Sequence, residues 1–114
     1  MKINVPTNPR KPTQHTIKEV VNLLNRKTNS DIFKLEGDNR IGVSGNANAE
    51  LHTRLVMLCG LWFCLHNSDY GCYTAVRGSQ NYGVYFEFGH EGSGVNEFFE
   101  FVASLGNVED ITLD

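Results

Sequence analysis

An eleven-residue apolar run, from Leu55 to Leu65, constrains the fold of this chain more than any other feature. A membrane-spanning helix needs about 20 apolar residues, so the run is too short to cross a bilayer. We expect it to form the second half of a central helix that begins near Ala49. A buried strand over Leu61 to Leu65 is the alternative, because periodicity does not separate the two over so short a run. A helix that is apolar all round is buried all round or covered by a partner. If a second copy of the chain is that partner, the protein is a homodimer.

One further helix is expected on each side of the central helix. Thr16 followed by Glu19 matches a capping box, and the apolar residues that come next have helical spacing, which predicts a helix ending near Lys27. A last helix is predicted over about 95–105, with Ser93 as its N-cap residue.

Two β-hairpins are expected between these helices. The first spans 32–44 and the second spans 72–88, each with glycine and asparagine at its turn. In the return strand of the second hairpin, apolar residues from Val84 onward alternate with Tyr85 and Glu87. That alternation is typical of an antiparallel sheet with one face in water.

These elements predict an α+β fold in the order αββαββα, with an optional strand at each end. The sheet is expected to be mainly antiparallel, with four to six strands and three helices. Residues 1–14 contain three prolines and are expected to form an extended arm. Residues 15–114 are expected to form a single domain, with a loop at 66–71 and an optional closing strand at 108–113.

The three cysteines favour a reducing compartment. Cys59, Cys64 and Cys72 are odd in number, whereas small secreted domains that depend on disulfides usually carry an even set. The first residues contain no apolar signal region. We therefore expect a cytoplasmic protein with no membrane association.

Cysteine and histidine side chains supply the candidates for metal or nucleophilic chemistry. Cys64, His66, Cys72 and His90 offer four nitrogen and sulfur ligands, the number of a structural zinc site, but at spacings that match no zinc signature. Cys72 with one of these histidines, oriented by Asp69, is the candidate nucleophilic set. With no catalytic signature present, we expect no enzyme activity, cofactor or metal. A cysteine- or metal-dependent enzyme stays as an alternative.

Charge is strongly segregated along the chain, although the net charge is only −3. Residues 1–30 carry six Lys or Arg against one acid, and the remainder carries four against twelve acids. The last 28 residues hold seven carboxylates and neither Lys nor Arg. Such a field can steer a basic protein surface toward the chain. Direct nucleic-acid binding is not expected, because the basic arm offers only Lys2, Arg10 and Lys11 and no interleaved aromatics.

These features predict a small intracellular inhibitor or adaptor, of the toxin-immunity or phage anti-defence kind. It would dock an acidic, tyrosine-bearing face on a basic partner such as a nucleic-acid enzyme, since tyrosines often anchor interfaces. The candidate binding residues are Tyr70, Tyr73, Arg77, Tyr82, Tyr85, Glu87, Glu91, Glu97, Glu100, Glu109 and Asp110. A protein that binds a nucleotide or anion, with Arg77 and Tyr73 or Tyr85 as ligand contacts, is the second hypothesis.

Overall fold

A computed structural model of the chain describes residues 14–44, 49–75 and 84–106. Its elements in chain order are α1 (Ile17–Thr28), β1 (Phe33–Glu36), β2 (Arg40–Val43), α2 (Glu50–Leu65), α3 (Asn67–Tyr70), β3 (Tyr73–Ala75), β4 (Val84–Glu87), the 3₁₀ turn η1 (His90–Gly92) and α4 (Val95–Ser104). The mixed α+β class and the antiparallel pairing expected from the sequence are confirmed.

The four described strands form one sheet in the order β1-β2-β4-β3, and every neighbouring pair is antiparallel. Leu35, Ile41 and Phe86 lie opposite one another in the register and therefore share a face. Ile41 and Phe86 are fully buried on that face, as the alternation predicted. Tyr85 and Glu87 point to the opposite face, which carries polar and charged side chains.

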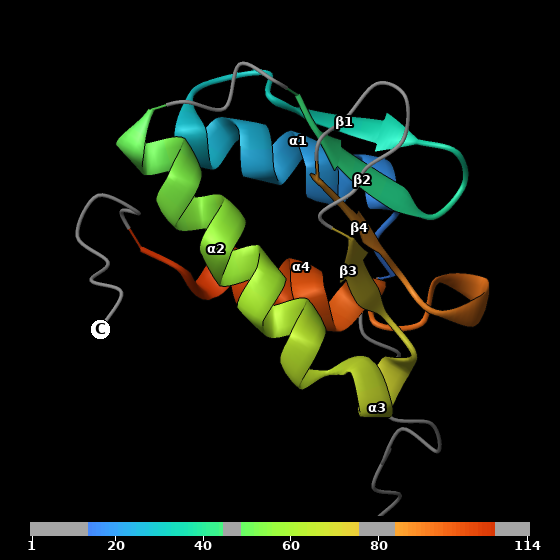
Figure 1. The fold of residues 1–114 in the computed structure, drawn as a ribbon. Coiled ribbons are helices and arrows are strands. Elements are labelled where there is room, and N and C mark those ends of the chain that lie inside the picture. Colours follow the sequence, from blue (N-terminus) through green and yellow to red (C-terminus); the bar gives the residue numbers. More distant parts are fainter. Residues whose placement is uncertain (1–13, 45–48, 76–83, 107–114) are drawn as a thin grey trace, which may run out of the picture.

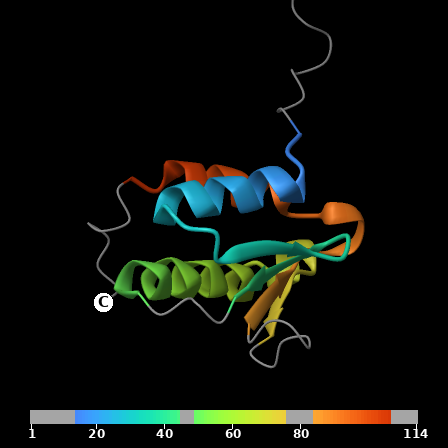
Figure 2. The same ribbon diagram turned by 90° about the horizontal axis from the view of Figure 1, so that it is seen from above.

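Two helices contact different halves of the sheet. α1 lies against β1 and β2, while α2 lies against β3 and β4 (Figure 1). The view from above shows α1 and α4 together in one layer, with the sheet and α2 in the other (Figure 2). Because α1 and α4 pack side by side, the most basic of the described helices lies against the acidic helix α4.

Aromatic side chains from three elements fill the centre of the core. The ring of Phe63 on α2 lies 5.1 Å from that of Phe86 and 4.9 Å from that of Phe98 on α4. Trp62 contacts Phe98 at 4.9 Å from the neighbouring position on α2. Large buried aromatics dominate the energy of a core, so this cluster holds α2, α4 and β4 together.

Two expectations about helices are corrected by the structure. α2 runs unbroken through Leu65, so the strand alternative over 61–65 is wrong. The segment 66–71, expected as a loop, contains the one-turn helix α3, which makes four α-helices in the described residues instead of three. Asn67 stabilises this turn because its side-chain amide donates to the carbonyl of Cys72 at 2.6 Å.

The start of α4 also differs from expectation. Its N-cap residue is Gly94 at φ 95°, not Ser93, and no side chain caps it. A Cβ at position 94 would lie 3.1 Å from the Cβ of Tyr70. Close approach to Tyr70 and a left-handed backbone therefore both favour glycine there.

Several expectations lie outside the described residues. These are residues 1–13 of the arm expected over 1–14, the turn of the second hairpin and the closing strand at 108–113.

Candidate functional site: an acidic face around Tyr70

The site begins at the first turn of α1, where the predicted capping box is confirmed. Thr16 Oγ1 accepts the backbone N–H of Glu19 at 3.1 Å, and Glu19 Oε1 accepts the N–H of Thr16 at 3.3 Å. The N–H of the preceding residue, His15, donates to Asn96 Oδ1 of α4 at 2.6 Å. One side chain of α4 therefore fixes the start of α1 directly.

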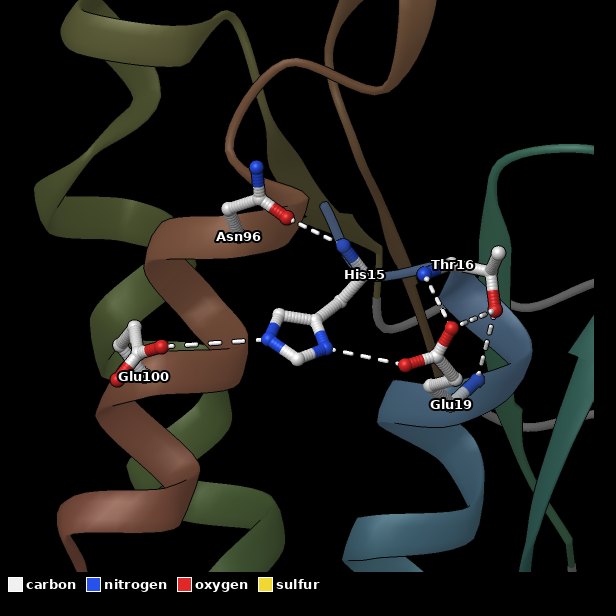
Figure 3. Close-up of polar contacts among 5 residues, drawn as sticks. All are labelled: His15, Thr16, Glu19, Asn96 and Glu100. Atoms are coloured by element: carbon white, nitrogen blue, oxygen red, sulfur yellow. Dashed lines mark hydrogen bonds and ion pairs between the residues drawn. The ribbon is translucent and has the colours of Figure 1, made fainter. Parts of the chain in front are cut away.

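The imidazole of His15 joins the two helices through two carboxylates (Figure 3). Its Nδ1 lies 3.0 Å from Glu19 Oε2, and its Nε2 lies 4.0 Å from Glu100 Oε1. The ring also stacks on Phe99, with centroids 3.5 Å apart. His15 thereby places Glu19 of α1 and Glu100 of α4 on one surface of the molecule.

The Glu19 carboxyl is held in its charged form. The hydrogen bond from His15, followed by the one from the Thr16 backbone, lowers the pKa of Glu19 below its ordinary value of 4.5. Glu100 projects further, with a side chain 75% exposed against 49% for Glu19. Both side chains are therefore exposed enough for a partner to contact.

Tyr70 lies beside the start of α4 as the last residue of α3. Burial is the main cause that raises the pKa of its hydroxyl, and the carboxylates of Glu97 and Asp69 raise it further. A half-buried tyrosine with a protonated hydroxyl presents both an apolar ring and a hydrogen-bond donor. Its ring packs 5.5 Å from that of His66 and 5.8 Å from that of Trp62.

An open cavity of about 580 Å³ lies between the start of α1, Tyr70 and the start of α4. Its lining includes His15, Tyr70, Asn96 and Glu97, together with the cation Lys18. We call Glu19, Tyr70, Glu97 and Glu100 the acidic face. Three elements build it: the first turn of α1, the end of α3 and α4 as far as Glu100.

The structure separates this face from two other candidate binding residues. Tyr85 and Glu87 lie on the opposite side of the sheet, where Arg40 Nε contacts Glu87 Oε1 at 2.5 Å. The same guanidinium lies 4.6 Å above the ring of Tyr85 and 3.6 Å from Glu36. Glu87 thus lies on a different side of the molecule from Glu97 and Glu100, and it is charge-compensated.

The remaining candidate binding residues are placed only in part. Tyr73 opens β3 opposite Glu87, and Glu91 belongs to η1. Arg77, Tyr82, Glu109 and Asp110 lie outside the described residues.

The cysteine and histidine candidates do not assemble a metal site. Across 14–44, 49–75 and 84–106, no three His, Cys, Asp or Glu side chains are arranged to hold a metal ion. Cys72 is buried, and its thiol donates weakly to the carbonyls of His66 and Phe63 at 3.5 and 3.7 Å. Burial raises the pKa of the Cys72 thiol, which opposes the thiolate that a nucleophile needs. His66 Nδ1 pairs instead with Asp69 Oδ2 at 2.9 Å.

Sequence reasoning missed His15, Glu19 and Asn96 as members of the site. The spacing of His15 and Glu19, four residues apart across a capping box, was a usable signal for their pairing. The partner on α4 has no local signal, because it lies 81 residues further along the chain.

Comparisons with protein-family models, with curated proteins and with solved structures find no match to this chain. Among the helices in the described parts of the chain, not one combines the length and the apolarity that a membrane crossing requires.

Proposed function

We propose that this protein is a small binding protein that docks its acidic face on a basic surface of another protein, as an inhibitor or adaptor. A nucleic-acid enzyme of the kind blocked by immunity proteins or phage anti-defence proteins fits this description, because its binding groove is basic. The proposal places the encounter in the cytoplasm and gives the chain itself no catalytic role.

The grouping of exposed carboxylates around a half-buried tyrosine carries the proposal. Glu97 and Glu100 are exposed on α4, and Tyr70 lies close enough for Glu97 to raise its pKa. Interfaces of this kind combine an aromatic anchor with a charged rim that guides the approach. Charge complementarity mainly accelerates association, so removal of these carboxylates is expected to slow binding.

Capture from the protein's own cellular background tests the proposal. The immobilised chain is compared with the double variant Glu97→Gln/Glu100→Gln and with the matched control Asp31→Asn/Glu50→Gln. The control removes two exposed carboxylates elsewhere, at the entry to β1 and in the first turn of α2.

The proposal expects a protein with a basic surface that the wild type and the control retain and that the double variant loses. If both variants retain the same proteins as the wild type, the acidic face is not the docking site.

The open cavity supports a second candidate function, the binding of a small polar ligand. Its volume of about 580 Å³ lies in the range of small-molecule sites, and its lining carries Lys18 beside the carboxylates of Asp38 and Glu97. A ligand at 100 times its dissociation constant stabilises a protein by about 2.7 kcal/mol. A thermal-shift screen with nucleotides would reveal such a ligand, and Lys18→Gln should abolish the shift.

A further inference from the structure

His15 stands between two carboxylates of the acidic face and meets them at different distances. Its Nδ1 lies 3.0 Å from Glu19 Oε2, which is hydrogen-bond distance, whereas its Nε2 lies 4.0 Å from Glu100 Oε1, which is not (Figure 3). Only 14% of the side chain is exposed, and the ring stacks on Phe99 with the two planes 7° apart. The backbone bond to Asn96 anchors the same residue, so the imidazole is held between α1 and α4.

The two distances have different consequences for the neutral and the protonated ring. A carboxylate only accepts hydrogen bonds, so Nδ1 must carry the proton that reaches Glu19. In the neutral imidazole the other nitrogen is then a bare lone pair, which offers Glu100 no donor. A second proton makes Nε2 a donor as well and places a positive charge within ion-pair distance of both carboxylates. Glu100 is 75% exposed, which leaves its side chain room to close on Nε2.

We propose that His15 is a proton-operated regulator of the acidic face. Its protonation ties Glu100 of α4 to Glu19 of α1 and takes one unit of negative charge from the surface offered to a basic partner. The inference rests on the proposed function, because it concerns the regulation of the same surface. Histidine ordinarily gains its charge between about pH 8 and pH 5, so mildly acidic conditions should weaken docking.

The charged and titratable groups around His15 come from four elements. Besides Glu19 and Glu100, they are the groups that line a cavity with His15 or with its neighbours: Lys18 and Arg26 of α1, Asp38 of the turn between β1 and β2, Tyr70 of α3 and Glu97 of α4. Lys, Arg, Asp and Glu side chains ordinarily keep their charge between about pH 5.5 and pH 8. Burial raises the pKa of the Tyr70 hydroxyl, which therefore stays neutral. Within this set, histidine is the type of residue that changes charge in that range.

Nitrogen-15 NMR of the histidine rings in the full chain tests the link without any partner. At about pH 8, His15 should carry its proton on Nδ1 and have a bare Nε2, and at about pH 5.5 both nitrogens should be protonated. The carboxyl carbon signal of Glu100 should shift between these two conditions in the wild type but not in His15→Gln, whose amide does not titrate. Circular dichroism confirms that this variant is folded. A second variant, Glu100→Gln, keeps His15 and should change its Nε2 signal only at the lower pH.

Binding of a synthetic hexa-arginine peptide at low ionic strength tests the effect on the acidic face. The guanidinium groups stay charged throughout, so any pH dependence comes from the protein. The wild type should bind about two- to fourfold more weakly at the lower pH, because in water one unit charge about 10 Å from an arginine changes binding by about twofold. His15→Gln should lose most of this dependence. The matched control His66→Gln, which removes a histidine paired with Asp69, should keep most of it.

The outcomes separate this inference from the proposed function. A bare Nδ1 at the higher pH, or a Glu100 signal that shifts equally in the wild type and in His15→Gln, would overturn the regulator whether or not the peptide binds. The same pH dependence of binding in these two proteins would also overturn it. Peptide binding that Glu97→Gln/Glu100→Gln leaves unchanged would overturn the docking site itself, and the regulation with it, even if the NMR signals confirm the link.

Discussion

Gly89 provides the most decisive single test of how the acidic face is held in place. It is buried between β4 and η1, directly against the backbone of Tyr70. A Cβ at this position would lie 1.7 Å from the carbonyl oxygen of Tyr70 and 2.9 Å from its carbonyl carbon. The backbone at Gly89 is extended at φ −69°, which any residue adopts, so the predicted cost of Gly89→Ala is purely steric.

The magnitude follows from which atoms collide. Overpacking a core costs typically 1–3 kcal/mol, and rotation of a side chain usually relieves part of it. Here the obstacle is backbone, so the segment after β4 must move away from α3 as a whole. We therefore expect Gly89→Ala to lower the free energy of unfolding by about 3 kcal/mol. At about 4 °C per kcal/mol for a domain of this size, the midpoint of thermal unfolding falls by about 12 °C.

Thermal unfolding followed by circular dichroism measures this loss, with Gly37→Ala as the control. Gly37 has φ +61° in the turn between β1 and β2, and a Cβ there meets nothing within 4 Å. Its substitution should cost only about 1 kcal/mol, from the left-handed backbone. The packing of Tyr70 described above is wrong if Gly89→Ala is as stable as the wild type or more stable than Gly37→Ala.

Three further predictions follow from particular residues. Gly60→Ala should raise the free energy of unfolding by up to about 1 kcal/mol, because alanine favours the helix and a Cβ there would make only an ordinary contact with the Phe86 ring at 3.8 Å. A urea titration measures this change. A decrease of more than about 1 kcal/mol in the unfolding free energy would contradict the packing of α2 on β4. The pKa of Glu19 is lower in the folded than in the unfolded state, so its contribution to stability is present above pH 4.5 and is lost as the pH falls through the folded-state pKa. The difference in unfolding free energy between the wild type and Glu19→Gln should therefore shrink below pH 4.5. A difference that does not depend on pH would refute this. Under native conditions a thiol reagent should label the exposed Cys64. It should spare Cys59 and Cys72, because both are buried and burial raises the pKa of each thiol. Equal labelling of all three cysteines, measured by mass spectrometry, would contradict the described core.

The elements with strong local patterns were predictable from the sequence. The alternation from Val84 onward identified a strand with one buried face, and the pair Thr16 and Glu19 identified the start of α1. α3 was missed because a one-turn helix shows no periodicity, and its stability comes from contacts such as the one between Asn67 and Cys72. The N-cap of α4 was missed because the close approach of Tyr70 decides it, and that contact is tertiary.

The candidate site was predictable only in part, since charge counting along a sequence does not see pairing across a sheet. Glu87 belongs to the acidic last quarter of the chain, yet Arg40 compensates it from 47 residues away. Glu97 and Glu100 remain exposed because α4 turns them outward while it buries Phe98 and Val102. Position in the chain therefore indicated where carboxylates occur in the sequence but not which of them lie together.

The association rate with a captured basic partner, measured as a function of ionic strength, tests the central claim most directly. If the acidic face steers the encounter, the rate for the wild type falls steeply with added salt. Glu97→Gln/Glu100→Gln then associates several-fold more slowly at low salt and with a shallower salt dependence, while the dissociation rate changes little. Equal rates and equal salt dependence for the two proteins would contradict the claim.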